Sequence, residues 1–160
     1  MKLTVTATLA AAALALTAAS PISATPPRPG CSPVQTRALI SHFVAAFNTG
    51  NRRAINDTWA SKLWFKWYSV TTDPGARTPE AAARRDTLLS YLADRHAANE
   101  RLTLTNVKIS GVSSGGYRNF EFHLMRSAAD LVGGPTAYRG KGASTCSTGR
   151  LIAWVMSAAE

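Results

Sequence analysis

The chain has 160 residues and a formal net charge of +9, with 18 Lys and Arg against 9 Asp and Glu. This length and a hydrophobic content of 46% predict one domain with a real hydrophobic core. The basic residues are scattered singly or in pairs, as in Arg52-Arg53, and no basic run interleaves with aromatic residues. We therefore do not expect nucleic acid as a partner. We interpret the charge as a solvated surface, or as one that meets anionic envelope polymers or lipid headgroups.

The N-terminus predicts a secretory signal peptide. Lys2 is a short basic start, residues 3–19 are an uncharged run rich in Ala, Leu and Thr, and small residues follow. Cleavage is expected after Ala24, with Ala19 as the alternative. A membrane span is the competing interpretation, but about 17 apolar residues are marginal for crossing a bilayer and no basic cluster follows them.

We therefore divide the chain into a cleaved signal peptide at 1–24, a Pro-rich lead at 25–32 and a single domain at 33–160. Arg28-Pro29-Gly30 before Cys31 lacks the aliphatic residue of a lipoprotein signal, which favours free export. The expected location is secreted or extracytoplasmic, in the cell envelope, with no membrane span after cleavage.

The two cysteines predict a disulfide between Cys31 and Cys146, because exported chains meet an oxidising environment. Two free thiols are the alternative. A catalytic cysteine is not expected, because Cys146 lies within a predicted strand and has no histidine near it in the sequence.

The first predicted helix follows Ser32, which forms a capping box with Gln35, and it ends at Gly50, a left-handed cap. His42 lies about 200° from the apolar stripe at 100° per residue and should face solvent. The apolar stripe that should lie on the core consists of Ile40, Phe43, Val44 and Phe47.

A short second helix is predicted around Ile55 and Trp59, which are spaced i, i+4, with Asp57 turned outward. An aromatic-rich strand at 64–70 and a loop at 71–77 follow.

A third helix is predicted to start at Thr78-Pro79-Glu80, a cap followed by a first-turn proline. Asp94 should face outward. Two interpretations of His96 stay open: a satisfied histidine at the end of the helix, or a polar group at a pocket mouth. The predicted inner stripe is Ala81, Leu88, Leu92 and His96.

Strands complete the chain. The apolar parity switches near Thr105-Asn106, which predicts a bulge or bend in a curved sheet. In the next strand, at 117–127, Glu121 and His123 share the face opposite Phe120 and Phe122. We interpret Glu121 and His123 as an outer-face surface pair; the alternative is an acid/base pair. A hairpin at 138–156, with its turn at Thr148-Gly149, forms the sheet centre.

This order of elements predicts an α+β fold, with helices on one side of a curved antiparallel sheet. The order, the helix-end segment Ala46-Phe47-Asn48-Thr49-Gly50-Asn51 and the strand at 64–70 resemble the nuclear transport factor 2-like superfamily, including its SnoaL-like branch, in an exported bacterial member. The resemblance covers about residues 33–157. It implies a cone-shaped, cystatin-like architecture of three helices and a sheet around an apolar pocket, which serves as an active site in some members and for binding in others.

We expect this cone to be aromatic-walled, with room above Gly140 and Gly142 and with no carboxylate reaching it. The alternative is that the same aromatics fill the cone completely. No catalytic residue, metal site or cofactor is assigned, because the three histidines show no ligand spacing. The candidate pocket residues are Phe43, Phe47, Trp59, Trp67, Tyr68, His96, Phe120, Phe122, Tyr138 and Gly142.

Three functions stay open. The first is an exported small-molecule-binding or interaction domain with an apolar ligand and no catalysis. The second is an isomerase, dehydratase or cyclase-type enzyme of the same fold. The third is an envelope-binding or dimerising protein that uses the basic outer face of the sheet, as a homodimer in the latter case.

Overall fold

The structure is a computed structural model that describes residues 31–70, 77–131 and 133–159, apart from the side chains of 66–70 and 77–81. The predicted signal peptide and most of the Pro-rich lead lie outside these residues. The helices are α1 (Pro33–Asn48), α2 (Arg52–Thr58) and α3 (Arg85–Ala97). The strands are β1 (Trp59–Val70), β2 (Arg77–Arg84), β3 (Arg101–Val112), β4 (Tyr117–Ser127), β5 (Thr136–Thr145) and β6 (Leu151–Ala158).

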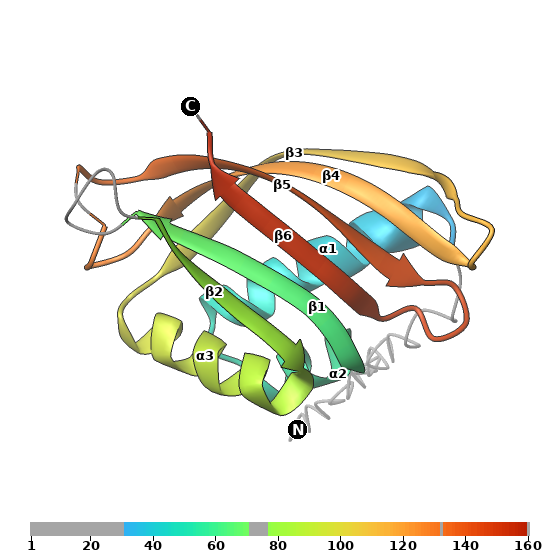
Figure 1. The fold of residues 1–160 in the computed structure, drawn as a ribbon, viewed down its shortest axis with the longest axis horizontal. Coiled ribbons are helices and arrows are strands. Elements are labelled where there is room, and N and C mark those ends of the chain that lie inside the picture. The colour runs from blue at the N-terminus through green and yellow to red at the C-terminus, as the bar shows by residue number, and fades with distance from the viewer. Residues whose placement is uncertain (1–30, 71–76, 132, 160) are drawn as a thin grey trace, which may run out of the picture.

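The strands form one six-stranded sheet in the order β2-β1-β6-β5-β4-β3, which curves over the helices (Figure 1). Helix α1 packs on β3, and α3 packs on β1 and β2. We call the face that meets the helices the inner face and the opposite one the outer face. The α+β prediction is confirmed, although the sheet is mixed: β1 and β6 run parallel, because a long connection through the other strands brings the chain back.

Helix α1 follows its sequence signals closely. Ser32 and Gln35 exchange both hydrogen bonds of the capping box, each at 3.2 Å, and Gly50 after the helix has a φ of 67°. The predicted stripe is buried and His42 is exposed, so both predictions are confirmed. The Asn48 side chain then joins the helix end to the sheet by bonding both backbone groups of Leu102.

The predicted start of the third helix is wrong. Residues 77–84 form strand β2, which pairs antiparallel with β1, and α3 begins only at Arg85. Strand β2 lies at the edge of the sheet, where a proline such as Pro79 is tolerated because one side of the strand needs no ladder partner. Strand pairing therefore overrides the local helix-start signal, and Ala81 belongs to the strand.

Two smaller boundaries also differ. Trp59 begins strand β1, where it pairs with Leu151 of β6, instead of lying in the second helix. Strand β5 ends at Thr145, so Cys146 lies in the turn before β6 and not within a strand. The predicted irregularity in β3 is confirmed, since the register with β4 shifts between Leu104 and Asn106.

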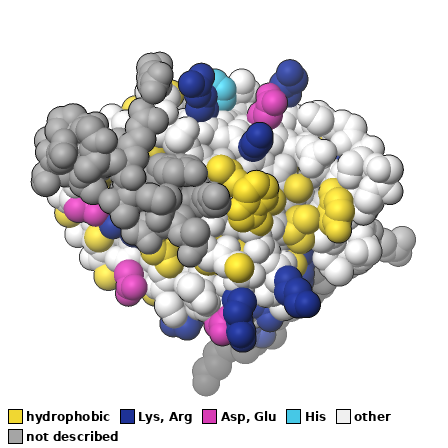
Figure 2. Space-filling view, in the orientation of Figure 1, with side chains coloured by type: hydrophobic (Ala, Val, Ile, Leu, Met, Phe, Trp, Pro, Cys, Tyr) yellow, Lys and Arg dark blue, Asp and Glu magenta, His cyan; other side chains and the backbone are white. Residues whose placement is uncertain are grey.

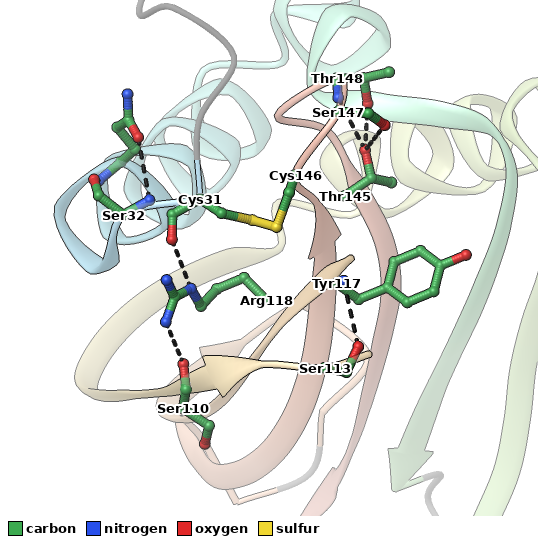
Figure 3. Close-up of a disulfide and its surroundings, with 11 residues drawn as sticks. Cys31, Ser32, Ser110, Ser113, Tyr117, Arg118, Thr145, Cys146, Ser147 and Thr148 are labelled. Atoms are coloured by element: carbon green, nitrogen blue, oxygen red, sulfur yellow. Dashed lines mark hydrogen bonds between the residues drawn. A yellow bond between two sulfur atoms is a disulfide. The ribbon is translucent and has the colours of Figure 1, made fainter. Parts of the chain in front are cut away.

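The predicted disulfide is confirmed. Cys31 and Cys146 are bonded, with Cα atoms 4.8 Å apart, and join the residue before α1 to the β5–β6 turn (Figure 3). Arg118 of β4 supports this corner, donating from Nε to the Cys31 carbonyl at 2.7 Å and from a terminal nitrogen to the Ser110 carbonyl at 2.8 Å. The disulfide thus anchors α1 to the sheet.

Candidate functional site

The inner face of the sheet is covered by an aromatic cluster. Trp154 of β6 stacks on Phe122 of β4 with ring centroids 3.9 Å apart. Phe43 of α1 meets Trp154 at 5.1 Å and Trp59 at 5.4 Å, both edge to face. None of these side chains is more than 1% exposed. Ring-to-ring contact of this kind is the packing of a hydrophobic core.

The two strand glycines do not leave the predicted room. A Cβ built on Gly140 would lie 2.3 Å from Phe122 Cζ, and one on Gly142 would lie 2.5 Å from Phe120 Cζ. The phenylalanine rings therefore sit directly on the glycine backbone. This corrects the expectation of space above the glycines, because the rings of β4 occupy it.

Apart from Gly142, the predicted pocket residues separate into three groups. The side chains of Trp67 and Tyr68 lie outside the described residues, although both backbones belong to β1. His96 lies apart, with Nδ1 3.1 Å from the Phe47 carbonyl oxygen and its ring against Gly50. The members that share one buried core are Phe43, Phe47, Trp59, Phe120, Phe122 and Tyr138.

His96 has features of both of its interpretations, since it is hydrogen-bonded at the end of a helix and also lines a small crevice. Its Nδ1 lies at hydrogen-bond distance from a carbonyl at the end of α1, which makes it a donor there. A crevice of about 90 Å³ lies beside it, lined mainly by Gly50, Ile55, Leu89 and Leu92. His96 therefore connects α3 to the end of α1 and does not line the aromatic cluster.

One carboxylate is buried inside the fold, at a position that no sequence pattern predicted. Glu100, directly before β3, has no exposed surface and accepts from Arg126 Nε at 2.6 Å and from a terminal Arg126 nitrogen at 2.9 Å. Arg126 is equally buried and donates to the Tyr138 hydroxyl at 3.1 Å. Arg95 of α3 also binds Glu100 and forms a two-bond pair with Asp130, at 2.6 and 2.7 Å.

The charges in this network stabilise one another. The hydrogen bonds that Arg95 donates to Asp130, ahead of the charge of Glu100, raise the pKa of Arg95. Burial alone would lower the pKa of Arg126, but bonding to Glu100 outweighs it, so that pKa is raised as well. The Arg95 side chain lowers the pKa of Asp130. Arg95, Arg126 and Asp130 are therefore held in their charged forms.

Strand parity contains a signal for the inward position of Arg126, because this residue continues the inward row of Phe120, Phe122 and Leu124. Glu100 has no such signal, since it lies between a helix and a strand. Both of its oxygens already accept from guanidinium groups, so this carboxylate has no means of reaching a substrate proton. We interpret the network as a structural link from α3 to the sheet.

The outer face, in contrast, is hollowed. A hollow of about 370 Å³ lies over Gly142, Ala143 and Ala153 beside Trp64, and a second of about 300 Å³ lies beside His123 and Arg139. Both are lined by Glu121, Lys141 and Val155, and we call the two together the outer-face groove. Figure 2 shows hydrophobic side chains in the middle of this view, with Lys and Arg side chains above and below them.

The register explains the shape of the groove. Trp64 pairs with Ala153, which pairs with Ala143, which pairs with Asn119, so two small side chains lie in a row between two large ones. The next row holds Val155, Lys141 and Glu121, the row that both hollows share. Trp64 is 55% exposed although its neighbour Phe65 is fully buried. The outer-face positions of Glu121 and His123 are confirmed.

The described residues contain no group of three or more His, Cys, Asp or Glu side chains placed to hold a metal ion. None of the helices formed by these residues is long and apolar enough to cross a membrane.

Comparison with known proteins gives a fold. No family model matches the sequence, and no curated protein matches it significantly. Solved structures do match. A protein with a cystatin-like fold from Caulobacter vibrioides has a TM-score of 0.64 at 11% identity, covering 79% of this chain and 89% of that one.

Two further matches name the fold and an activity. A nuclear transport factor 2-like protein of unknown function from Burkholderia xenovorans LB400 has a TM-score of 0.57 at 12% identity, covering 82% of this chain and 88% of that one. A candidate polyketide cyclase from Sinorhizobium meliloti has a TM-score of 0.56 at 15% identity, covering 75% and 94%.

The chain has the nuclear transport factor 2-like fold. The resemblance found in the sequence is therefore confirmed at the level of the fold. Identities of 11 to 15% carry no activity from these proteins to this one.

Proposed function

We propose that this protein is an exported, non-catalytic binding domain whose binding site is the outer-face groove. Its aromatic cluster, where the sequence predicts an apolar ligand, then serves as the structural core. The observation that carries the proposal is Trp64, more than half exposed at the wall of a hollow of about 370 Å³. Large aromatic side chains beside concave surfaces are typical of ligand sites.

The disulfide supports the proposal that the protein is exported. The disulfide between Cys31 and Cys146 is stable outside the cytoplasm, and the predicted signal peptide would bring the chain there. Cleavage after Ala24 is part of this proposal.

An enzyme is the second candidate, and one observation favours it. Glu121 and His123 line the same hollow of about 300 Å³, and a carboxylate beside an imidazole is a common acid/base arrangement. Under this alternative, Glu121→Gln and His123→Asn would each abolish turnover of an isomerase or cyclase substrate. Under our proposal, the native chain turns over no such substrate.

A fragment screen followed by amide NMR tests which face binds. We expect small aromatic acids to shift the amide signals of Ala143, Ala153 and Val155 on the outer face. Binding that shifts Phe43, Leu88 and Leu92 instead would place the site among the helices and overturn the proposal. Isothermal titration of the same fragments against Trp64→Ala provides the control, since weaker binding is expected only for a ligand at the groove.

A further inference from the structure

The outer face has a longer row of hollows than a small molecule needs, and we call this row the track. A third hollow, of about 490 Å³, lies on the other side of Trp64 and is lined by Tyr117, Thr145 and Ile152, among others. Between Thr145 and Arg139 the strand β5 rises ~20 Å, at about 3.3 Å per residue. Hollows therefore follow one another along the strands for most of the length of β5.

Two aromatic side chains stand along this track. Trp64 is 55% exposed and Tyr117 is 41% exposed, and both line the third hollow. Figure 3 shows Tyr117 pointing away from the disulfide, opposite to its neighbour Arg118. Exposed indole and phenol rings on a rigid sheet give flat apolar surfaces that each keep a polar tip, which suits stacking against ring-shaped ligands.

The charges beside the track are unequal. Lys108 and Lys141 flank Glu121 in register on the neighbouring strands, and Arg139 lies opposite His123. The ion pairs recorded among the described residues involve none of these side chains. Lys62 lines the third hollow as well, so four cations against one carboxylate leave this face positive, and its charge complements an anionic ligand.

A second copy of the chain fits this face poorly. A symmetric pair would bring eight cations against two carboxylates, because each copy supplies four and one. Desolvating like charges against each other disfavours such an interface. A phosphate polymer without sugar rings also fits less well, since it has no ring to stack on Trp64 or Tyr117 and no hydroxyl group for Glu121, a carboxylate that readily accepts hydrogen bonds from hydroxyl groups.

We propose that the outer-face groove binds an acidic polysaccharide, whose sugar rings stack on Trp64 and Tyr117 and whose carboxylates pair with Arg139 and Lys141. The side chains of Asn119 and Glu121 then accept hydrogen bonds from the sugar hydroxyl groups. This inference rests on the proposed function, and it adds the chemical class of the ligand.

The test is isothermal titration of the full chain with polygalacturonic acid, which combines pyranose rings with carboxylates. Its fully methyl-esterified form has the same rings without the charge, and poly-L-glutamate has the charge without the rings. We expect polygalacturonic acid to bind at least about tenfold more tightly than either, with an affinity that falls as salt rises. Oligothymidylate is included as an anionic polymer with flat bases.

The variants locate the site. Trp64→Ala and the double change Arg139→Gln with Lys141→Gln should each weaken binding about tenfold, while Trp64→Phe keeps most of it. The charge-matched control is Arg52→Gln with Arg53→Gln, two exposed arginines of α2 outside the groove, which should change affinity less than about twofold.

Several outcomes overturn the inference. Equal losses in the groove and control variants indicate general charge attraction, and equal affinity for poly-L-glutamate or oligothymidylate indicates another class of polymer. A dimer that buries Trp64 would also overturn it. If no polysaccharide binds while small aromatic acids still shift Ala143 and Val155 amides, the ligand class is wrong and the proposed function stands; if neither binds there, both are wrong.

Discussion

Strand β4 alternates between two environments along its whole length. Phe120 and Phe122 are 1% exposed and lie on glycine backbone of the next strand, whereas Glu121 and His123, one residue away from them, stand in an open hollow. Since successive strand side chains point to opposite faces, these four consecutive residues build both a core and a surface. The side chains of the inner face pack against other side chains and the backbone of the protein, whereas the outer face has small residues where a ligand would lie.

The largest effect is expected when the buried charges are unbalanced. Glu100→Gln should lower the free energy of unfolding by about 3–5 kcal/mol, because it leaves Arg126 buried without a counter-charge. Urea unfolding measures this. The matched control is Asp130→Asn, which removes a half-exposed partner of Arg95 and should cost no more than about 1 kcal/mol. Equal costs for the two variants would contradict the structural role of Glu100.

Truncating an aromatic ring of the inner face should lower the free energy of unfolding nearly as much as Glu100→Gln. Phe122→Ala removes the ring that stacks on Trp154 and should destabilise the protein by about 3–5 kcal/mol, through lost burial and a cavity. Chemical denaturation with near-ultraviolet circular dichroism follows it. Asn119→Ala on the outer face of the same strand is the control and should stay within about 0.5 kcal/mol. A cost below about 1 kcal/mol for Phe122→Ala would mean that the inner face is loosely packed.

Filling the inner face should also destabilise. Gly142→Ala places a methyl group 2.5 Å from Phe120 Cζ and from the Ala153 carbonyl oxygen, and should cost about 1–3 kcal/mol in thermal unfolding. Gly111→Ala is a matched strand glycine, since a Cβ there meets nothing within 4 Å, and it should be neutral. A neutral Gly142→Ala would show that space exists above β5 after all.

The pH dependence of the network should be small and acidic. Arg95 lowers the pKa of Asp130, so this pair stabilises the folded state above the unfolded pKa of about 3.9 and loses that effect as pH falls through the lower folded value. Asp130→Asn should therefore cost up to about 1 kcal/mol near pH 7 and nothing near pH 2, because the side chain is half exposed and screened. A difference that grows on acidification would contradict the sign.

The smallest effect is expected on the outer face. Trp64→Ala should change the free energy of unfolding by no more than about 0.5 kcal/mol, because more than half of the side chain already contacts solvent. Differential scanning calorimetry of this variant alongside Phe122→Ala compares the two faces directly. A loss above about 2 kcal/mol would assign Trp64 to the core and remove the argument for a binding surface.

Local patterns predicted much of the fold. The capping box at Ser32, the stripe of α1, the parity of β4 and the disulfide are confirmed, because each depends on neighbours in sequence or on the redox chemistry of an exported chain. The start of α3 was predicted wrongly, because the signal at Thr78-Pro79-Glu80 competes with an edge-strand pairing that no local pattern contains. The same holds for the parallel pairing of β1 with β6.

Sequence periodicity therefore predicts which side chains face inward on the regular elements, since periods of 3.6 and 2 residues follow from backbone geometry. Whether the inward rings enclose a ligand or contact one another was decided only in the tertiary structure, because it depends on how closely Phe120 and Phe122 approach the glycines of β5. The tertiary structure also pairs Glu100 with Arg126 and brings Ala153 next to Trp64. Sequence periodicity predicts neither contact, because the partners are far apart along the chain.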